Sequence, residues 1–252
     1  MSEGLVVIPT YNERENAELI IRRVFALPRA FDVLIIDDGS PDGTAAVVRG
    51  LLAEFPERLF LEERAGKQGL GTAYLHGFRW ALARAYPFVF EMDADFSHNP
   101  DDLLRLHQAC AQDGYDVAIG SRYSSGVNVV NWPMARVLLS WLASGYVRLV
   151  TGMPIHDATA GFKCYSANVL RAIDLDNIRF VGYAFQIEMK WLAYQLGFRI
   201  KEVPIIFTDR TRGQSKMSKG IVLEAFFGVL QMKICSLFHK PHRATGAVAF
   251  SK

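Results

Sequence analysis

Short runs of β-branched and aromatic residues alternate with longer segments of helical apolar spacing along the first half of this chain. The runs predict strands at 5–8, 33–36, 59–61, 88–92 and 117–119. The segments between them predict helices at 13–27, 43–52 and 69–83, and one that follows Asn99 and Pro100 and ends at 111. Such alternation is typical of an α/β fold in which helices cover both faces of a mostly parallel sheet.

The second half of the chain is less regular. It predicts helices at 134–150, 183–196 and 221–238, and strands at 161–165 and 200–207. Pro204 in the last run indicates an edge strand, because proline lacks the N–H group that a central strand needs. Residues 208–219 are polar and predict a loop, whereas 241–252 have no periodicity. We expect one domain over 1–240, with amphipathic helices at its C-terminal end, and a disordered tail at 241–252.

Charge and cysteine content narrow the function classes. Lys and Arg total 28 against 26 Asp and Glu, and this net charge of +2 gives no reason to expect a nucleic-acid partner. Three distant cysteines without a CxxC pair favour a reduced, intracellular protein. The first residues lack the pattern of a signal peptide. The longest apolar stretches, 137–147 and 221–232, are shorter than the ~20 residues of a membrane span, but either suits a membrane surface.

Polar clusters follow four of the five strands predicted in the first half, at 9–13, 37–40, 93–95 and 120–123. The carboxyl ends of parallel strands meet at one edge of a sheet, where ligands bind in open α/β folds. We therefore expect these four clusters to line one cleft.

Three carboxylates in these clusters are candidates for binding. Asp93 and Asp95 could hold a divalent cation such as Mg²⁺ together with substrate phosphates, or they could cap the turn before the next helix. Asp38 could accept hydrogen bonds from a base or a ribose, or it could belong to a turn that leads into a helix. A calcium loop is excluded at 38–49, because Arg49 stands where the closing Glu is needed.

Basic residues gather in the second half of the chain, and together they indicate phosphate binding, although each one alone suits a solvated surface. They are Arg122, Arg136, Arg210, Arg212, Lys216 and Lys219. Glycines at 66–71 suit either a close approach to a ligand or a close helix–sheet contact. The histidines at 98, 107 and 156 do not have metal-ligand spacing. Asp157 and Glu188 are either site residues or satisfied core carboxylates.

Several motifs resemble those of one enzyme family. Residues 8–13 (Ile-Pro-Thr-Tyr-Asn-Glu), 36–44 (Ile-Asp-Asp-Gly-Ser-Pro-Asp-Gly-Thr) and 92–95 (Met-Asp-Ala-Asp) resemble inverting family 2 glycosyltransferases. The motifs at 120–123, 131–133, 160–162 and 210–216 resemble the narrower group of dolichol-phosphate, or polyprenol-phosphate, mannose synthases. The resemblance extends over residues 4–238 in the right order.

The resemblance implies a single GT-A, Rossmann-like domain that transfers mannose from GDP-mannose to a polyprenyl (dolichyl) phosphate. The anomeric centre would be inverted, and the products would be a β-mannosyl lipid phosphate and GDP. By position, the guanosine contacts would be Pro9, Tyr11, Glu13, Ile36 and Asp38. Asp93, Ala94 and Asp95 would hold the diphosphate and Mg²⁺ or Mn²⁺, with Asp93 and Asp95 as the metal ligands. The phosphates of donor and acceptor would meet Arg122, Arg136, Arg210 and Lys216, which with Asp95 would carry catalysis.

This chain departs from the family pattern at two points. Ser97 stands where some members carry Gln next to the metal, and the C-terminal transmembrane helices of many members are absent from the sequence. The acceptor's apolar tail must stay in a bilayer, so we expect a peripheral protein at the cytoplasmic face of a membrane, with a membrane subunit as a possible partner. The candidate surface helices are 137–147, between Arg136 and Arg148, and 221–238, which has Lys219, Lys233 and Lys240 around it.

The acceptor chemistry makes a catalytic base unnecessary. A phosphate monoester has a second pKa near ~6 and is largely an ionised nucleophile at neutral pH. Two other functions remain open. One is glucose-type transfer from a UDP-sugar to the same lipid, and the other is an inactive regulatory subunit that binds nucleotide-sugars. The presence of Asp93, Asp95, Arg122 and Lys216 argues against the inactive subunit.

Overall fold

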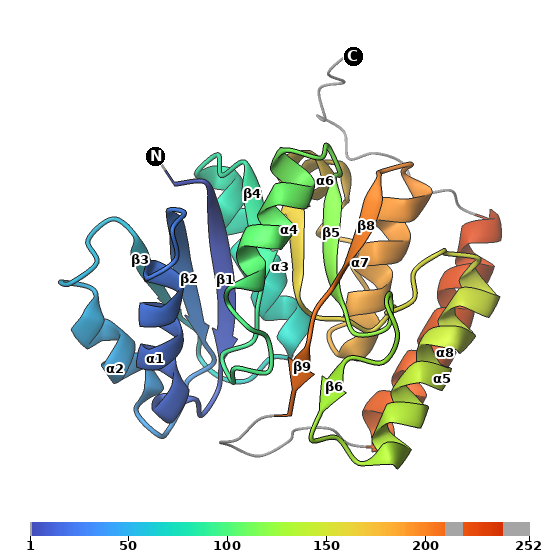
Figure 1. Ribbon diagram of the computed structural model, residues 1–252, viewed down its shortest axis with the longest axis horizontal. Helices are drawn as coiled ribbons and strands as arrows, with labels where there is room; N and C mark the ends of the chain where they lie inside the picture. Colours follow the sequence, from blue (N-terminus) through green and yellow to red (C-terminus); the bar gives the residue numbers. More distant parts are fainter. Residues whose placement is uncertain (1, 210–218, 239–252) are drawn as a thin grey trace.

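The computed structural model describes residues 2–209 and 219–238. Its centre is a seven-stranded sheet of order β3-β2-β1-β4-β7-β5-β8 (Figure 1). The strands are β1 Gly4–Thr10, β2 Phe31–Asp37, β3 Leu59–Glu63, β4 Phe88–Glu91, β5 Val117–Ser121, β7 Lys163–Ser166 and β8 Ile200–Pro204. β7 runs antiparallel to its neighbours β4 and β5, and the other pairs are parallel. The expected mostly parallel sheet is thus confirmed.

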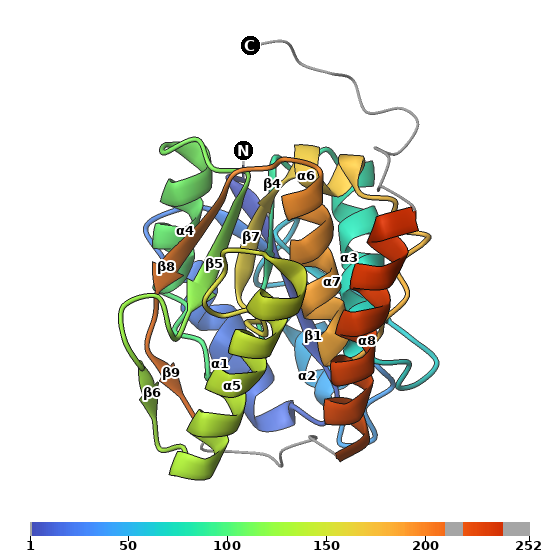
Figure 2. The same ribbon diagram turned by 90° about the vertical axis from the view of Figure 1, so that its right-hand side faces the viewer.

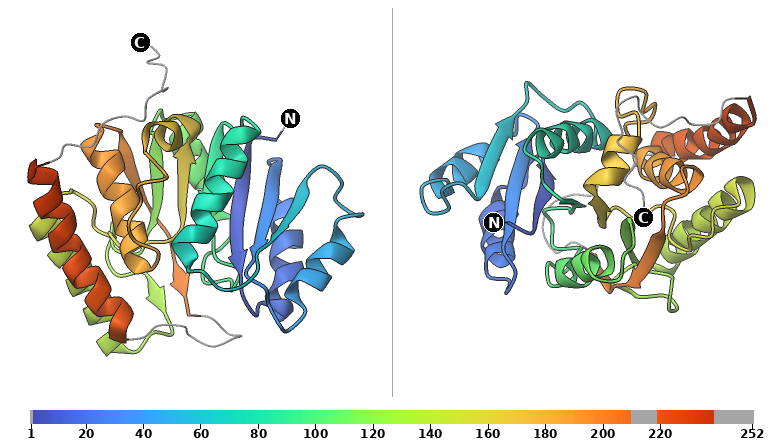
Figure 3. Two further views of the ribbon diagram at one scale, coloured as in Figure 1. Left: turned by 180° about the vertical axis from the view of Figure 1, so that it is seen from behind. Right: turned by 90° about the horizontal axis from the view of Figure 1, so that it is seen from above.

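Helices cover both faces of this sheet, as Figure 3 shows from behind and from above. They are α1 Arg14–Phe25, α2 Thr44–Leu51, α3 Leu70–Ala83, α4 Asp102–Ala111, α5 Met134–Thr151, α6 Ala167–Ala172, α7 Tyr183–Gln195 and α8 Lys219–Phe238. Alternate residues of β1 enter different cores: Val6 and Ile8 pack with α1, α2 and α4, whereas Leu5 and Val7 pack with α3, α6 and α7. Because both sides of each central strand are buried, the strands read as continuous apolar runs.

α5 and α8 lie side by side (Figure 2) beyond α7, at the end of the molecule away from β3 (Figure 1). The stacked rings of Tyr146 and Phe226 join them, with centroids 4.6 Å apart. The buried residues of α5 are Ser144, Val147 and Thr151, whereas apolar side chains such as Leu138 and Leu142 stay exposed. No helix in the described parts of the chain is long and apolar enough to cross a membrane.

The structure differs from the expected elements at three points. The run 200–207 is divided into β8, which is an edge strand as Pro204 indicated, and β9 Phe207–Thr208, which pairs with β6 Val129–Val130. The helix expected after Asn99 and Pro100 begins at Asp102, and the Asn99 side chain instead accepts the N–H of Asp101 at 3.1 Å. The short elements α6, β6 and β9 carry too few residues for a periodic signal. Residues 210–218 and 241–252 lie outside the described residues.

Candidate active site

The four polar clusters lie at one edge of the sheet, as the alternation predicted. β1, β2, β4 and β5 share one direction, and their carboxyl ends point to the lower edge in Figure 1. At this edge Thr10 is paired in register with Asp37. The loops that follow these strands therefore form one continuous surface for a ligand.

Asp37 and Asp42 shape the loop after β2 rather than face a ligand. Asp37 accepts the Thr10 hydroxyl at 2.9 Å and the Ser40 hydroxyl and N–H at 2.6 and 2.8 Å. Asp42 accepts the N–H groups of Thr44 at 3.0 Å and Arg14 at 3.1 Å, and so joins the starts of α1 and α2. These contacts tie the loop after β2 to the first turns of both helices.

Asp38 is buried at the edge and is held by Arg64, a residue that the sequence interpretation missed. The Arg64 Nε donates to Asp38 Oδ1 at 2.6 Å, and its Nη1 donates to the Thr72 hydroxyl at 2.9 Å. Arg64 comes directly after β3. Its position at the end of a parallel strand is the signal that could have identified it. The ion pair with Arg64 fixes the Asp38 carboxylate at an edge where a nucleotide base could contact that carboxylate.

The other proposed guanosine contacts differ in exposure. Tyr11 and Pro9 are both partly exposed, and Lys67 Nζ lies 5.3 Å from the Tyr11 ring centroid. Glu13 is buried, and its carboxylate accepts the Asn16 side-chain N–H at 3.0 Å. Ile36 is fully buried in the core beneath α3, so its side chain does not reach the surface that would face a ligand.

Asp93, Ala94 and Asp95 follow β4 at the middle of this edge. Asp95 is buried and accepts the Ser97 N–H at 3.0 Å, and Asp93 accepts the Tyr74 hydroxyl at 3.3 Å. The Asp93 N–H donates to His98 Nδ1 at 3.4 Å. Burial lowers the pKa of His98, which favours the neutral ring that this bond requires. His98 is therefore a turn residue, consistent with its lack of metal-ligand spacing.

The acidic pair fits a hard divalent cation that takes its remaining ligands from substrate and water. In the described residues no group of three or more His, Cys, Asp and Glu side chains is arranged to hold a metal. Next to the pair, the buried Ser97 hydroxyl has no hydrogen-bond partner among the described residues. Two carboxylates and an unused hydroxyl are oxygen donors of the kind that Mg²⁺ and Mn²⁺ accept alongside diphosphate oxygens.

Arg122, directly after β5, is locked onto Asp157. Its Nε and Nη2 donate to the two carboxylate oxygens at 2.7 and 2.6 Å, its N–H donates to the same carboxylate at 2.9 Å, and Nη2 also reaches the Thr159 hydroxyl at 2.9 Å. Burial alone would raise the pKa of Asp157, but the Arg122 guanidinium lowers it overall. Asp157 is thus a fully buried carboxylate with both oxygens bound by Arg122. The other candidate, Glu188, caps the backbone N–H groups of Arg179 and Phe180, and burial raises its pKa.

Aromatic rings surround the two guanidinium groups at this end of the edge. The Arg122 guanidinium carbon lies 5.3, 5.4 and 5.5 Å from the ring centroids of Tyr123, Trp132 and Phe207. Arg136, at the start of α5, lies 4.1 Å from the Trp132 centroid and forms an ion pair with Asp209 at 3.0 Å. Trp132 therefore contacts both cations. The predicted contacts Arg210 and Lys216 lie outside the described residues.

Comparison with known proteins agrees with this geometry. Residues 5–174 match the family described as glycosyl transferase family 2. The polyprenol monophosphomannose synthase of Mycolicibacterium smegmatis is 49% identical over 230 residues, which are 91% of this chain and 86% of that protein. The undecaprenyl-phosphate mannosyltransferase of Micrococcus luteus is 47% identical over 225 residues, or 89% of this chain and 91% of that protein.

A solved structure shares the fold. Glucosyl-3-phosphoglycerate synthase from Mycobacterium tuberculosis, in complex with Mn²⁺, UDP-glucose and phosphoglyceric acid, has a TM-score of 0.65 at 16% identity and covers 91% of this chain and 78% of its own. At that identity the likeness concerns the fold alone. The family match over more than half of the chain, and relatives nearly half identical over most of it, show that the chain belongs to glycosyl transferase family 2.

Proposed function

We propose that this chain transfers mannose from GDP-mannose to a polyprenyl phosphate, with inversion at the anomeric carbon. The observation that carries the proposal is the division of one sheet edge into two halves. The carboxylates of Asp38, Asp93 and Asp95 lie on one half, with Asp38 and Asp95 buried and Asp93 partly exposed, and Arg122 and Arg136 flank Trp132 on the other. A nucleotide diphosphate-sugar and a second phosphate need both kinds of group. The two mannosyltransferase relatives support mannose as the sugar.

In the reaction, an acceptor phosphate oxygen attacks the anomeric carbon, and the bond from that carbon to the donor diphosphate breaks. GDP leaves with the electron pair of that bond. Asp93 and Asp95 would hold Mg²⁺ or Mn²⁺, which when bound neutralises charge on the leaving diphosphate. Arg122 and Arg136 would bind phosphate oxygens, together with Arg210 and Lys216 by family resemblance. No protein base takes part, because the acceptor phosphate arrives ionised.

The test is transfer by the purified chain in the presence of Mg²⁺ or Mn²⁺. GDP-mannose and UDP-glucose are offered separately, each with short undecaprenyl-type and dolichyl-type phosphates. We expect a mannosyl lipid phosphate from GDP-mannose, with β stereochemistry by NMR, and at least about 100-fold slower transfer from UDP-glucose. Faster transfer from UDP-glucose would favour the glucose-type enzyme. Nucleotide binding without turnover of either donor would favour a regulatory subunit.

We further propose that the paired helices α5 and α8 rest on a membrane surface at its cytoplasmic face. Exposed apolar side chains recur at helical spacing on α5, where Leu138 is 52%, Trp141 50% and Leu142 58% exposed. They continue on α8, where Phe227 is 63% exposed. Apolar side chains bordered by cations such as Arg136 and Arg148 are typical of an interfacial helix. The acceptor's phosphate would then arrive beside Arg136 while its tail stays in the bilayer.

Co-sedimentation with liposomes tests this surface. We expect weak, reversible binding that increases with anionic lipid and decreases in Leu138→Glu/Leu142→Glu. In that variant the KM for a long-chain acceptor should rise, while the KM for a short-chain acceptor stays the same. The matched control is Leu19→Glu, an exposed apolar position on α1 at 46%. Absence of liposome binding, with unchanged use of both acceptors, would assign the membrane contact to another surface or to a partner subunit.

A further inference from the structure

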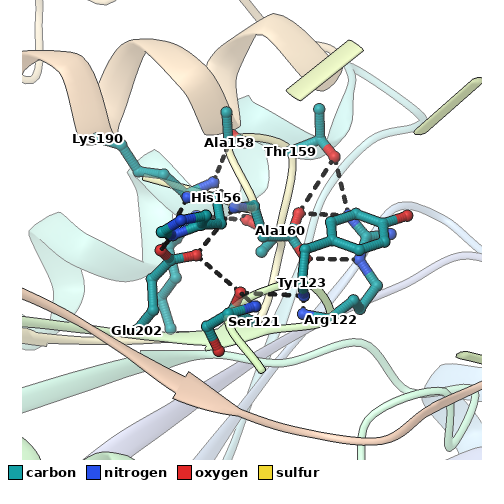
Figure 4. A network of polar contacts seen from close by, with 12 residues as sticks. Ser121, Arg122, Tyr123, His156, Ala158, Thr159, Ala160, Lys190 and Glu202 are labelled. Carbon is teal, nitrogen blue, oxygen red and sulfur yellow. Dashed lines mark hydrogen bonds and ion pairs between the residues drawn. The ribbon is translucent and has the colours of Figure 1, made fainter. Parts of the chain in front are cut away.

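The loop of residues 156–160 contacts three elements that are far apart in the sequence. It follows α5, precedes β7, and lies between the ends of β5 and β8 on one side and α7 on the other. Figure 4 shows Lys190 reaching the loop from its helix, and Ser121, Arg122 and Glu202 lying on the strand side. We refer to residues 156–160 as the platform loop.

Glu202 ties the platform loop to the sheet. Its Oε1 accepts the Ser121 hydroxyl at 2.7 Å and the Asp157 N–H at 2.9 Å. Its Oε2 accepts the N–H of His156 at 2.8 Å and lies 2.8 Å from Nδ1 of the same residue. One carboxylate thus joins β8, β5 and two successive residues of the loop. Multiple hydrogen bonds to an ionised group are stronger than neutral ones and restrict its geometry.

Lys190 holds the platform loop from the opposite side. Its Nζ donates to the backbone carbonyls of Ala158 at 2.7 Å and Ala160 at 2.8 Å. Lys190 is fully buried, and in the described part of the chain it forms no ion pair. Burial lowers its pKa well below the usual value, and the Lys163 ammonium acts in the same direction. An apolar residue would avoid the free energy of burying an amine, so the two carbonyl contacts are the structural reason for a lysine here.

The platform-loop residues between the contacts of Glu202 and those of Lys190 are the ones that hold Arg122. Asp157 is fully buried and gives Arg122 both carboxylate oxygens, and Thr159 adds its hydroxyl. Glu202 binds the N–H of Asp157, while Lys190 binds the carbonyls on either side of Thr159. The position of the Arg122 guanidinium therefore depends on groups that do not touch the cleft.

We propose that the platform loop exists to hold the Arg122 guanidinium in a fixed position for the transfer step, with Asp157 and Lys190 as positioning residues. This inference rests on the proposed function, in which Arg122 binds a phosphate. A cation held in place before the reaction stabilises developing charge without reorganising during the step. A displacement of about 1 Å in such a group can lower a rate by about 100-fold.

A double-mutant cycle tests whether Lys190 acts through Arg122. We expect Lys190→Met to lower kcat by about 10- to 100-fold while the KM for GDP-mannose changes by less than about threefold. In an Arg122→Ala background, the same substitution should lower kcat by less than about twofold, because its target is already absent. An equal loss in both backgrounds, or no loss in either, would overturn the proposal. Lys201→Met, an exposed lysine on β8 that pairs with Asp113, is the matched control and should keep full kcat.

Thr159→Val covers the case in which Lys190→Met does not fold. It keeps the shape of a half-buried side chain and removes one acceptor of Arg122. We expect a three- to tenfold lower kcat, an unchanged melting temperature and again no further loss in Arg122→Ala. A wild-type kcat in Thr159→Val would count against the platform.

A measurement without turnover separates this inference from the proposed function. In ¹⁵N-arginine spectra the Arg122 Nε–H, assigned by its loss in Arg122→Lys, should exchange slowly with water because it donates to a buried carboxylate. In Lys190→Met its exchange should be at least about tenfold faster. An unchanged exchange rate would overturn the platform even if the wild type transfers mannose. A wild type that transfers no sugar, but shows this change in exchange, would overturn the proposed function alone.

Discussion

The two halves of the site edge are built differently. On the β1–β2 side, loop contacts join residues two or three apart, as Thr44 with Asp42 and Ser40 with Asp37, or 26 to 28 apart, as Asp38 with Arg64 and Asp42 with Arg14. On the β5–β8 side, Arg122 meets Asp157 across 35 residues, Arg136 meets Asp209 across 73, and Ser121 meets Glu202 across 81. The first half combines short turns with contacts between the loops of neighbouring strands and helices, whereas the second half joins segments up to 81 residues apart.

This difference has a consequence for substitutions. In the β1–β2 half, a change should act at the residue altered and on its partner in the adjoining loop, as Arg64 does on Asp38. In the β5–β8 half, a change should act at a distance, because each cation is oriented by a partner from another element. Substitutions at Asp95, at Arg122 and Arg136, and at Asp38 test this division.

Removal of the acidic pair should have the largest effect. Asp95→Ala, or an excess of chelator with the wild type, should lower transfer by more than about 1,000-fold, because charge on the leaving diphosphate would no longer be neutralised. The melting temperature should stay within a few degrees of the wild type. Asp101→Ala is the control, since this carboxylate pairs with Arg23 at the surface. Full activity of Asp95→Ala in excess chelator would contradict a metal role for the pair.

Truncation of Arg122 or Arg136, the cations of the β5–β8 half, should have the second-largest effect on activity. Arg122→Ala should lower kcat/KM by about 10- to 100-fold, the equivalent of ~1.5–3 kcal/mol for charge-assisted hydrogen bonds. Because the variant also leaves Asp157 buried without its partner, its unfolding free energy should fall as well. Arg136→Ala should lower kcat/KM by a similar factor with a smaller loss of stability, since its ion pair with Asp209 is partly exposed. Equal destabilisation by both would contradict the difference in burial.

The β1–β2 half should give a smaller, local effect. Asp38→Asn should raise the KM for the donor by about 3- to 30-fold, the loss of about one hydrogen bond, and leave kcat and the acceptor KM nearly unchanged. Arg64→Lys should produce part of this effect, because Arg64 holds the Asp38 carboxylate. Isothermal titration with GDP measures the same loss without turnover. A larger effect on the acceptor KM than on the donor KM would contradict the division of the edge.

The pH dependence of kcat should differ least between the wild type and its variants. The acidic limb of kcat should follow the acceptor phosphate near ~6, and its midpoint should be the same in Asp157→Asn although the rate is lower. A shifted midpoint in that variant would indicate that Asp157 is a base rather than a partner of Arg122.

Stability should depend on pH through Asp157 in a defined direction. Its pKa is lower in the folded chain, so its contribution is present above its unfolded pKa of ~3.9 and is lost as pH falls through the folded value. Urea unfolding at several pH values should therefore show a shallower acid decline in Asp157→Asn than in the wild type.

Much of the fold and of the candidate site was predictable from the sequence. The alternation of strands and helices, the convergence of four polar clusters and the position of Asp93 and Asp95 after β4 follow from periodicity and from the direction of parallel strands. Arg64 and Asp209 were missed because neither belongs to a short motif, and the role of Asp157 stayed open because its partner lies 35 residues away. A sequence pattern reports contacts between residues at a fixed, short spacing. These contacts join residues that are far apart in the chain and have no fixed spacing.

The sequence by itself determined the layered α/β fold, the edge that carries the site and the residue types available there. Hydrophobic periodicity and turn chemistry are local properties, and they act on each segment before distant segments meet. Only the tertiary structure decided that Arg122 is locked by Asp157, that Lys190 and Glu202 anchor the platform loop, and that apolar side chains of α5 stay exposed. The physical reason is that a buried charge is stable only where several elements supply its partners together, and that arrangement is a property of the packed chain.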